Sequence, residues 1–279
     1  MIYYNHSITN SHEWSIKNEK NHKVLTFMGL KVKLKKRINL DNLDEKLNSL
    51  SVKISSDIAY KDWWDRTSIY NSLEKEAHQE TLQFIKTHID LNKVILLKDR
   101  WQNLLYCIDK AKKIPGLYIE CGVHSGRSIN HAARHNRNIT FHGFDSFEGL
   151  PEEWSGNSMQ TGAFDLGGCL PEVEKNVRLY KGWFNESLTK FFKEQDEKIA
   201  FLHVDCDIYQ STVDIFNIVE QYLQKGTIIV FDEYFNYPNW QNHEFKAFNE
   251  FITRTNFKFE YISIGHLQVG IRILEVGSK

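Results

Sequence analysis

Hydrophobic residues change their spacing near Pro115, and the change divides the chain into two differently patterned parts. Before Pro115, residues 56–114 carry apolar side chains at three- and four-residue intervals, which predicts helices with one buried face. Trp63 and Trp64 belong to this pattern, and we interpret them as core residues rather than as a binding platform. After Pro115, short apolar runs alternate with amphipathic segments. Strands are predicted at 117–121, 140–145, 177–181, 199–205 and 227–232, and helices at 127–136, 186–194, 211–224 and 243–255.

The alternation of strands and helices predicts right-handed crossovers and a mostly parallel sheet with helices on both faces. The end of the chain differs, because FEYISI (259–264) and LQVGIRIL (267–274) are separated only by Gly265 and His266. Two strands joined so tightly must be antiparallel. The predicted fold class is therefore α/β, with the Rossmann-like sheet of class I methyltransferases and an antiparallel C-terminal strand. This arrangement favours S-adenosylmethionine over NAD as the ligand.

The N-terminal region has a pattern of its own. Residues 22–37 (HKVLTFMGLKVKLKKR) alternate apolar and polar side chains around Met28–Gly29, which predicts a basic β-hairpin. Its lysines either contact an anionic membrane surface or an acidic partner, or protect a solvated edge strand from aggregation. A short helix opening at Asp41 is predicted over 41–50. We divide the chain into a hairpin extension (1–55), a helical cap segment (56–114) and a catalytic domain (115–279).

Composition limits the class of partner and the compartment. The formal net charge is −1, so no global field favours nucleic acid. No apolar run approaches the roughly 20 residues that span a bilayer, and no signal peptide is predicted at the N-terminus. The four cysteines lack CxxC spacing, and Cys121 and Cys206 lie in predicted core strands, which suits a reducing cytoplasm. We expect a cytoplasmic protein, with peripheral contact at the inner membrane face through 22–37 as an alternative; a homo-oligomer stays open.

A glycine turn follows the first predicted strand of the catalytic domain. In YIECGVHSGRS (118–128), Glu120 ends the strand, glycines stand at 122 and 126, and a helix is predicted from Arg127. Glycine lets the backbone approach a ligand closely or adopt a positive φ. The turn is interpreted either as part of a pocket for a nucleotide-like ligand or as an ordinary turn at the end of a strand.

The next two strand ends carry further candidate residues. Asp145 stands where a carboxylate would accept hydrogen bonds from ribose hydroxyls, and its alternative role is to cap the following turn. After the third strand, Gly182, Trp183 and Phe184 could form a flat wall for adenine, unless Trp183 is a buried core residue.

Acidic residues end the fourth and fifth strands. HVDCDIYQST supplies Asp205 and Asp207, and VFDEY supplies Asp232 and Glu233. The two strands are neighbours in the class I order, so these carboxylates would converge, repel one another and require a cation. Oxygen ligands select a hard ion such as Mg²⁺. The alternative is that Asp207 begins the next helix and that Ser211 and Asp214 form a capping box.

These motifs together resemble one family. ECGVHSGRS, GFDSFEGLPEEW, KGWF, HVDCDIYQST and FDEY with HEFKAFNEF are similar, in order and spacing, to the macrocin O-methyltransferase (TylF/MycF-type) family of metal-dependent sugar O-methyltransferases. The likeness covers about residues 115–275. It implies S-adenosylmethionine, Mg²⁺ and a sugar hydroxyl as methyl acceptor. It implies metal binding by Asp205, Asp232 and Glu233, and cofactor binding by Glu120, Gly122, Ser125, Gly126, Ser128, Asp145, Ser146, Gly182, Trp183 and Asp205.

Two positions depart from that family's pattern. Val123–His124 replaces the central glycine of the commonest ExGxGxG turn, and the second acidic pair is Asp-Glu where related sequences often have Asp-Asp. A weaker likeness of GLKVKLKK to bacterial surface-polysaccharide enzymes points to a glycan, glycolipid or nucleotide-linked sugar as acceptor.

The expected reaction is in-line methyl transfer to a sugar hydroxyl. Asp205 is the first candidate for the proton acceptor, with His203, His243 and His266 as alternatives. Tyr209, Tyr234 and Trp240 are candidate walls for a sugar ring, and the glycine-rich segment 150–171 is a candidate flap or a plain surface loop. Two rival functions remain open: methyl transfer to a non-sugar diol, and a non-catalytic scaffold in a glycan-assembly complex.

Overall fold

The computed structural model describes residues 14–19, 22–27, 30–35 and 43–277. By its internal contacts the chain divides into two units, with the boundary between Ser68 and Ile69. The division into extension, cap segment and catalytic domain that we expect on functional grounds stays a prediction.

The first unit contains a small antiparallel sheet and one long helix. The sheet has the order β1 (Trp14–Glu19), β2 (His22–Phe27), β3 (Leu30–Lys35). The predicted hairpin corresponds to β2 and β3, while β1 is an additional strand that the sequence pattern did not indicate. The predicted turn at Met28–Gly29 and the helix start at Asp41 lie outside the described residues. Helix α1 (Leu43–Thr67) is much longer than the short helix expected over 41–50.

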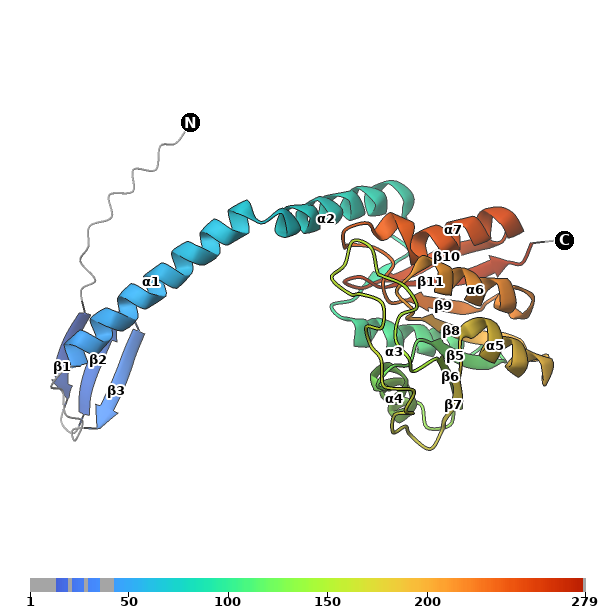
Figure 1. The fold of residues 1–279 in the computed structure, drawn as a ribbon, viewed down its shortest axis with the longest axis horizontal. Helices are drawn as coiled ribbons and strands as arrows, with labels where there is room; N and C mark the ends of the chain where they lie inside the picture. Colours follow the sequence, from blue (N-terminus) through green and yellow to red (C-terminus); the bar gives the residue numbers. More distant parts are fainter. Residues whose placement is uncertain (1–13, 20–21, 28–29, 36–42, 278–279) are drawn as a thin grey trace. The chain divides into compact units, whose positions relative to one another are not determined.

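The aromatic residues at the end of α1 are not core residues of this unit. Trp63 and Trp64 are 50% and 51% exposed, so the expectation that they are buried is wrong for the described chain. Helix α1 extends past the three strands of its own unit (Figure 1).

The second unit is built on an eight-stranded sheet of order β4-β10-β11-β9-β8-β5-β6-β7 (Figure 1). All neighbouring strands are parallel except β11, which is antiparallel to both β10 and β9, as predicted from the tight connection at Gly265–His266. Residues 95–96 form the edge strand β4, where the sequence pattern predicted helix. The strands are β4 (Ile95–Leu96), β5 (Leu117–Cys121), β6 (Phe141–Asp145), β7 (Val177–Lys181), β8 (Ile199–Val204), β9 (Ile228–Phe231), β10 (Lys258–Ile264) and β11 (Val269–Glu275).

Helices cover both faces of this sheet. Residues of α3 and α4 pack on one face with Tyr118 and Phe201, while residues of α5, α6 and α7 pack on the other with Ile119 and Leu202. Successive strand residues therefore face opposite layers, which explains the nearly continuous apolar runs. The helices are α2 (Ile69–His88), α3 (Arg100–Ala111), α4 (Arg127–His135), α5 (Phe184–Lys193), α6 (Tyr209–Val219) and α7 (Glu244–Thr255).

The register of the sheet brings the carboxyl ends of β5, β6, β8 and β9 to one edge. Val204 of β8 lies beside Phe231 of β9, so the acidic residues that follow the two strands are neighbours. The backbone N–H of Asp232 continues the pairing by donating to the carbonyl of Val204 at 2.9 Å. The site described next lies at this edge.

Candidate functional site

A cavity of about 370 Å³ opens at the carboxyl edge of the sheet. Residues of the glycine turn, of the strand ends and of segment 150–171 all contribute to its wall. Of the residues predicted from sequence, it is lined by Gly122, Ser125, Ser128, Asp145, Ser146, Trp183, Asp205 and Glu233. Aromatic residues add a large apolar part to the wall: Trp101, Trp154, Phe164, Trp183 and Phe184.

A buried carboxylate at the end of β5 stabilises the glycine turn through a hydrogen bond. Glu120 is buried at the end of β5, and its Oε1 accepts a hydrogen bond of 2.9 Å from the hydroxyl of Ser128 in the first turn of α4. Gly122 has a φ of +95°, and a Cβ at this position would lie 1.6 Å from the carbonyl oxygen of Asp205. Only glycine fits where β5 and β8 leave the sheet so close together. Gly126 caps α4 in the left-handed conformation and faces a smaller neighbouring cavity.

Asp145 organises the same turn. One carboxylate oxygen accepts from the backbone N–H groups of Val123 and His124 at 2.8 and 2.7 Å, and the other accepts from Phe147 at 2.7 Å. The turn-capping role that was the alternative interpretation is therefore present, although Asp145 also lines the cavity. These hydrogen bonds fix the backbone at Val123 and His124, the two non-glycine residues in the middle of the turn.

The wall beyond β7 is aromatic. Gly182 has a φ of +138°, and Trp183, which directly precedes α5, is 37% exposed and lines the cavity, so it is not a buried core residue. The segment 150–171 contributes Leu150, Pro151, Trp154 and Phe164 to the wall. Trp154 is buried and packs edge-on against Tyr237 at 5.5 Å, so this part of the segment is docked on the domain.

Carboxylates from β8 and β9 form two overlapping groups. Asp205, Asp207 and Glu233 each offer a carboxylate oxygen within 4.8 Å of the others. In the second group, a ring nitrogen of His203 and carboxylate oxygens of Asp205 and Asp232 lie within the same distance of one another. The predicted ligands Asp205, Asp232 and Glu233 are thus divided between two groups that share Asp205.

Asp207 does not start the next helix in the way that the alternative interpretation required. Helix α6 begins at Tyr209 after Ile208, without a side-chain cap, and Ser211 and Asp214 lie inside the helix rather than in a capping box. Asp207 itself has a φ of +67°, a backbone conformation that Asp tolerates better than most residues.

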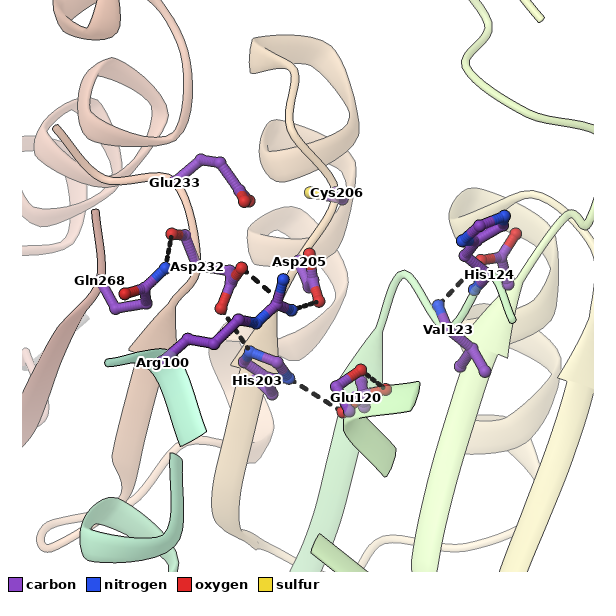
Figure 2. A network of polar contacts seen from close by, with 12 residues as sticks. Arg100, Glu120, Val123, His124, His203, Asp205, Cys206, Asp232, Glu233 and Gln268 are labelled. Atoms are coloured by element: carbon purple, nitrogen blue, oxygen red, sulfur yellow. Dashed lines mark hydrogen bonds and ion pairs between the residues drawn. The ribbon is translucent and has the colours of Figure 1, made fainter. Parts of the chain in front are cut away.

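Arg100 reaches into the acidic cluster from the first residue of α3 (Figure 2). Its Nη2 lies 3.0 Å from Oδ2 of Asp205 and 3.0 Å from Oδ2 of Asp232. Burial lowers the pKa of Arg100, but the charges of Asp205 and Asp232 outweigh it and raise the pKa. No motif in the sequence pointed to Arg100.

His203 lies beneath the cluster, between two carboxylates (Figure 2). Its Nδ1 is 2.9 Å from Oε2 of Glu120 and its Nε2 is 3.6 Å from Oδ1 of Asp232. Burial lowers the pKa of His203, but Asp232 and Glu120 outweigh it and raise the pKa to about 10. The side chain is 1% exposed and does not line the cavity.

The carboxylates of the cluster have pKa values shifted from the ordinary values of Asp and Glu. Burial, followed by repulsion from Asp232, raises the pKa of Asp205 and Glu233 well above the ordinary values and that of Asp207 to about 7. Asp232 is the exception, because the hydrogen bond and charge of His203, together with Arg100, outweigh burial and lower its pKa. His203 and Arg100 therefore lower the pKa of Asp232 below its ordinary value, whereas for Asp205 burial and repulsion from Asp232 outweigh the same two cations.

Glu244 is a second residue that the sequence reasoning missed. This fully buried first residue of α7 accepts from the backbone N–H of Cys206 at 3.4 Å and of Glu233 at 3.2 Å. It thereby joins the loops after β8 and β9. The motif HEFKAF contains it, but nothing local distinguishes it from a surface helix residue.

Several residues proposed from sequence lie away from the cavity. Tyr234 and Trp240 are buried in the core, and Tyr209 contacts Glu250 of α7, so none of the three is a cavity wall. His243 contacts Ser155 and His266 is exposed outside the cavity lining, so neither is placed to accept a proton there.

The sheet order, the reversed strand β11 and the glycine turn over the cavity define a class I methyltransferase fold. Comparison with known proteins agrees: residues 119–234 match a family model described as a methyltransferase domain. The likeness to the solved structure of the O-methyltransferase NovP concerns the fold, with a TM-score of 0.51 and 21% identity over 63% of this chain and 80% of that one.

Two curated relatives are O-methyltransferases. Mycinamicin III 3''-O-methyltransferase of Micromonospora griseorubida is 28% identical over 162 residues, 48% of this chain and 62% of that protein. The matched region therefore spans less than two thirds of that relative's length. A tetracenomycin rhamnosyl 4'-O-methyltransferase of Streptomyces olivaceus is 26% identical over 66% of this chain and 78% of that protein. The second unit is thus similar in sequence to O-methyltransferases and contains the region that matches the methyltransferase-domain model.

Proposed function

We propose that this protein transfers a methyl group from S-adenosylmethionine to a sugar hydroxyl, with Mg²⁺ held at the acidic edge of the sheet. The observation that carries the proposal is that Asp205 and Glu233 line the same cavity as the glycine turn. Both relatives are O-methyltransferases by name, and the name of the Streptomyces olivaceus enzyme includes a rhamnosyl group, which supports a sugar acceptor and the macrocin O-methyltransferase type of enzyme.

The binding site for the methyl donor is proposed to lie along the glycine turn. Gly122, Ser125 and Ser128 line the cavity, Glu120 holds Ser128 from below, and Asp145 fixes the turn through backbone N–H groups. S-adenosylmethionine supplies an electrophilic methyl group when bound. Trp183 offers an exposed aromatic face at the far wall, as an adenine ring requires.

The carboxylate oxygens at the acidic edge of the sheet are suitable ligands for a hard divalent cation. Oε2 of Glu233 is buried without a hydrogen-bond partner among the described residues, and Asp205, Asp207 and Glu233 bring three carboxylate oxygens close together. We assign the ligand role to Asp205, Asp232 and Glu233, with Asp207 beside them. A bound Mg²⁺ lowers the pKa of an acceptor hydroxyl and orients it.

The proton of the acceptor hydroxyl is proposed to pass to a cavity carboxylate. Asp205 lines the cavity, and burial followed by the charge of Asp232 raises its pKa, which makes its carboxylate a stronger base than that of an exposed Asp. His203 is better placed to hold Asp232 than to meet the substrate, because it is enclosed between Glu120 and Asp232. We therefore propose His203 as a positioning residue.

Glycan or surface-polysaccharide biosynthesis is proposed as the setting. The basic strands β2 and β3 would supply a peripheral contact with a membrane surface or with glycan-assembly enzymes. A homo-oligomer is proposed as a further partner state. Among the described residues, no helix combines the length and apolar character that a membrane span requires.

Calorimetry with S-adenosylhomocysteine, followed by an acceptor screen, tests the proposal. Nucleotide-linked sugars, glycosides and catechols are incubated with S-adenosylmethionine, and S-adenosylhomocysteine release is measured with Mg²⁺ and with excess EDTA. Turnover only on sugars and only with Mg²⁺ is the expected result. Turnover on catechols alone would favour the non-sugar diol, full turnover in EDTA would remove the metal, and absence of cofactor binding would favour a scaffold.

A further inference from the structure

One nitrogen of Arg100 stands between the two strand-end aspartates. Its Nη2 donates a hydrogen bond of 3.0 Å to Asp205, and lies at the same distance from Asp232 as an ion pair without hydrogen-bond geometry. The two carboxylates come from different strands, β8 and β9, and the guanidinium is the cation that holds them together (Figure 2).

Arg100 reaches this position from the rim of the cavity rather than from the core. Its side chain is 38% exposed, whereas that of Asp232 is 3% exposed. It is the first residue of α3, directly after Asp99, whose side chain caps the helix through the N–H of Gln102. The guanidinium also lies 5.0 Å from the ring of Trp101, which lines the same cavity. The backbone end of Arg100 is thus anchored while its charged end contacts solvent and an aromatic surface.

We propose that Arg100 is a tethered cation that neutralises Asp205 and Asp232 in the metal-free protein and must leave them when a divalent ion binds. The inference rests on the metal site of the proposed function and extends it to a competition within the chain.

The physical basis of the competition is charge and space. Mg²⁺ binds carboxylate oxygens at about 2.1 Å, so an ion bound to Oδ2 of Asp205 and of Asp232 would occupy the space that the guanidinium nitrogen takes between these two oxygens. Without either cation, carboxylates this close repel one another in a poorly hydrated place. Arg100 would therefore stabilise the empty site and raise the ion concentration needed to fill it.

Manganese binding to the full-length protein tests the competition. Mn²⁺ affinity is measured by calorimetry and by the loss of the free-ion electron paramagnetic resonance signal, for the wild type and Arg100→Gln. Arg127→Gln is the matched control, since Arg127 also lines the cavity but makes no ion pair with a carboxylate among the described residues. We expect Arg100→Gln to bind Mn²⁺ about tenfold more tightly, and the control within about twofold of wild type.

Thermal unfolding supplies a second readout. Arg100→Gln should melt at a lower temperature than wild type in EDTA and should gain more from Mn²⁺, because a tighter ligand stabilises the folded state further. If Arg100→Gln does not fold without metal, Arg100→Lys, which keeps the charge, is expected to fold in EDTA and to bind Mn²⁺ within about threefold of wild type.

The outcomes separate this inference from the proposed function. Equal or weaker Mn²⁺ binding by Arg100→Gln would overturn the competition while the metal site itself stands. Absence of Mn²⁺ binding in both proteins would overturn the competition and also remove the metal from the proposed reaction.

Discussion

At the scale of single residues, Glu244 holds the two acidic loops in place. Its carboxylate accepts the N–H groups of Cys206 and Glu233, both in the interior. Glu244→Ala leaves these donors unpaired, and we expect it to lower the free energy of unfolding by about 2 kcal/mol or more. Urea titration measures the loss. Glu250→Ala, on the exposed side of the same helix, is the control and should cost less than about 1 kcal/mol; a similar loss for both variants would contradict the role of Glu244.

Asp207 gives the metal-free protein a particular dependence on pH. Burial and the charge of Asp232 raise its pKa to about 7, so the folded state binds this proton more tightly than the unfolded state. Its favourable contribution is fully present below about pH 4, the ordinary value for Asp, and is lost as the pH rises through 7. The free energy of unfolding in EDTA should therefore fall over this range.

The variant Asp207→Asn removes this titration and keeps a residue that tolerates a positive φ. We expect a shallower decline between pH 4.5 and 5.5, a window in which His203 is charged in both states, because its folded pKa is about 10 and an unfolded His titrates at about 6.5. Melting temperatures of the two proteins across that window measure the difference. An unchanged slope would show that Asp207 is not among the groups whose pKa is raised.

At the scale of elements, the glycine turn depends on the end of β8. A Cβ at Gly122 would meet the carbonyl oxygen of Asp205, so Gly122→Ala must displace one of the two backbones. We expect a loss of at least about 2 kcal/mol in unfolding free energy and a loss of S-adenosylhomocysteine binding measured by calorimetry.

Gly162 is a matched control for this prediction. It also has a positive φ, of +80°, but no atom lies within 4 Å of the position its Cβ would take. Gly162→Ala should therefore cost only the left-handed backbone term, about 1 kcal/mol, and leave cofactor binding intact. Equal effects of the two substitutions would mean that backbone conformation, rather than the contact with β8, decides the outcome.

At the scale of the whole molecule, cofactor binding should reside in the second unit. Every residue that lines the cavity lies between Arg100 and Glu233, and the unit from Ile69 onward has its own core. A chain that begins at Ile69 is expected to bind S-adenosylhomocysteine within about threefold of the full-length affinity, measured by calorimetry. Loss of binding in a folded truncated protein would contradict this, and would assign the first unit a part in the site.

Most of the second unit's architecture could be predicted from local pattern. Strands β5 and β7 and the reversal of β11 lie where the sequence placed them, because a strand covered on both faces needs an apolar run and a two-residue connection forces antiparallel pairing. The exposure of Trp63 and Trp64 could not be predicted, since the same helical spacing occurs whether or not a neighbour covers the helix. The edge strand β4 was missed because its two residues carry no period of their own.

By itself the sequence determined the strands, the glycine turn and the acidic residues at the strand ends, because each follows from residues adjacent in the chain. The expected convergence of those ends required the strand order of the class I fold as well. Only the tertiary structure decided which groups balance those charges. Arg100 is 105 residues away from Asp205, and Glu244 closes the loops after β8 and β9 from the start of α7. Charge pairing depends on distance in space, and no local periodicity records which helix end will lie above a strand end.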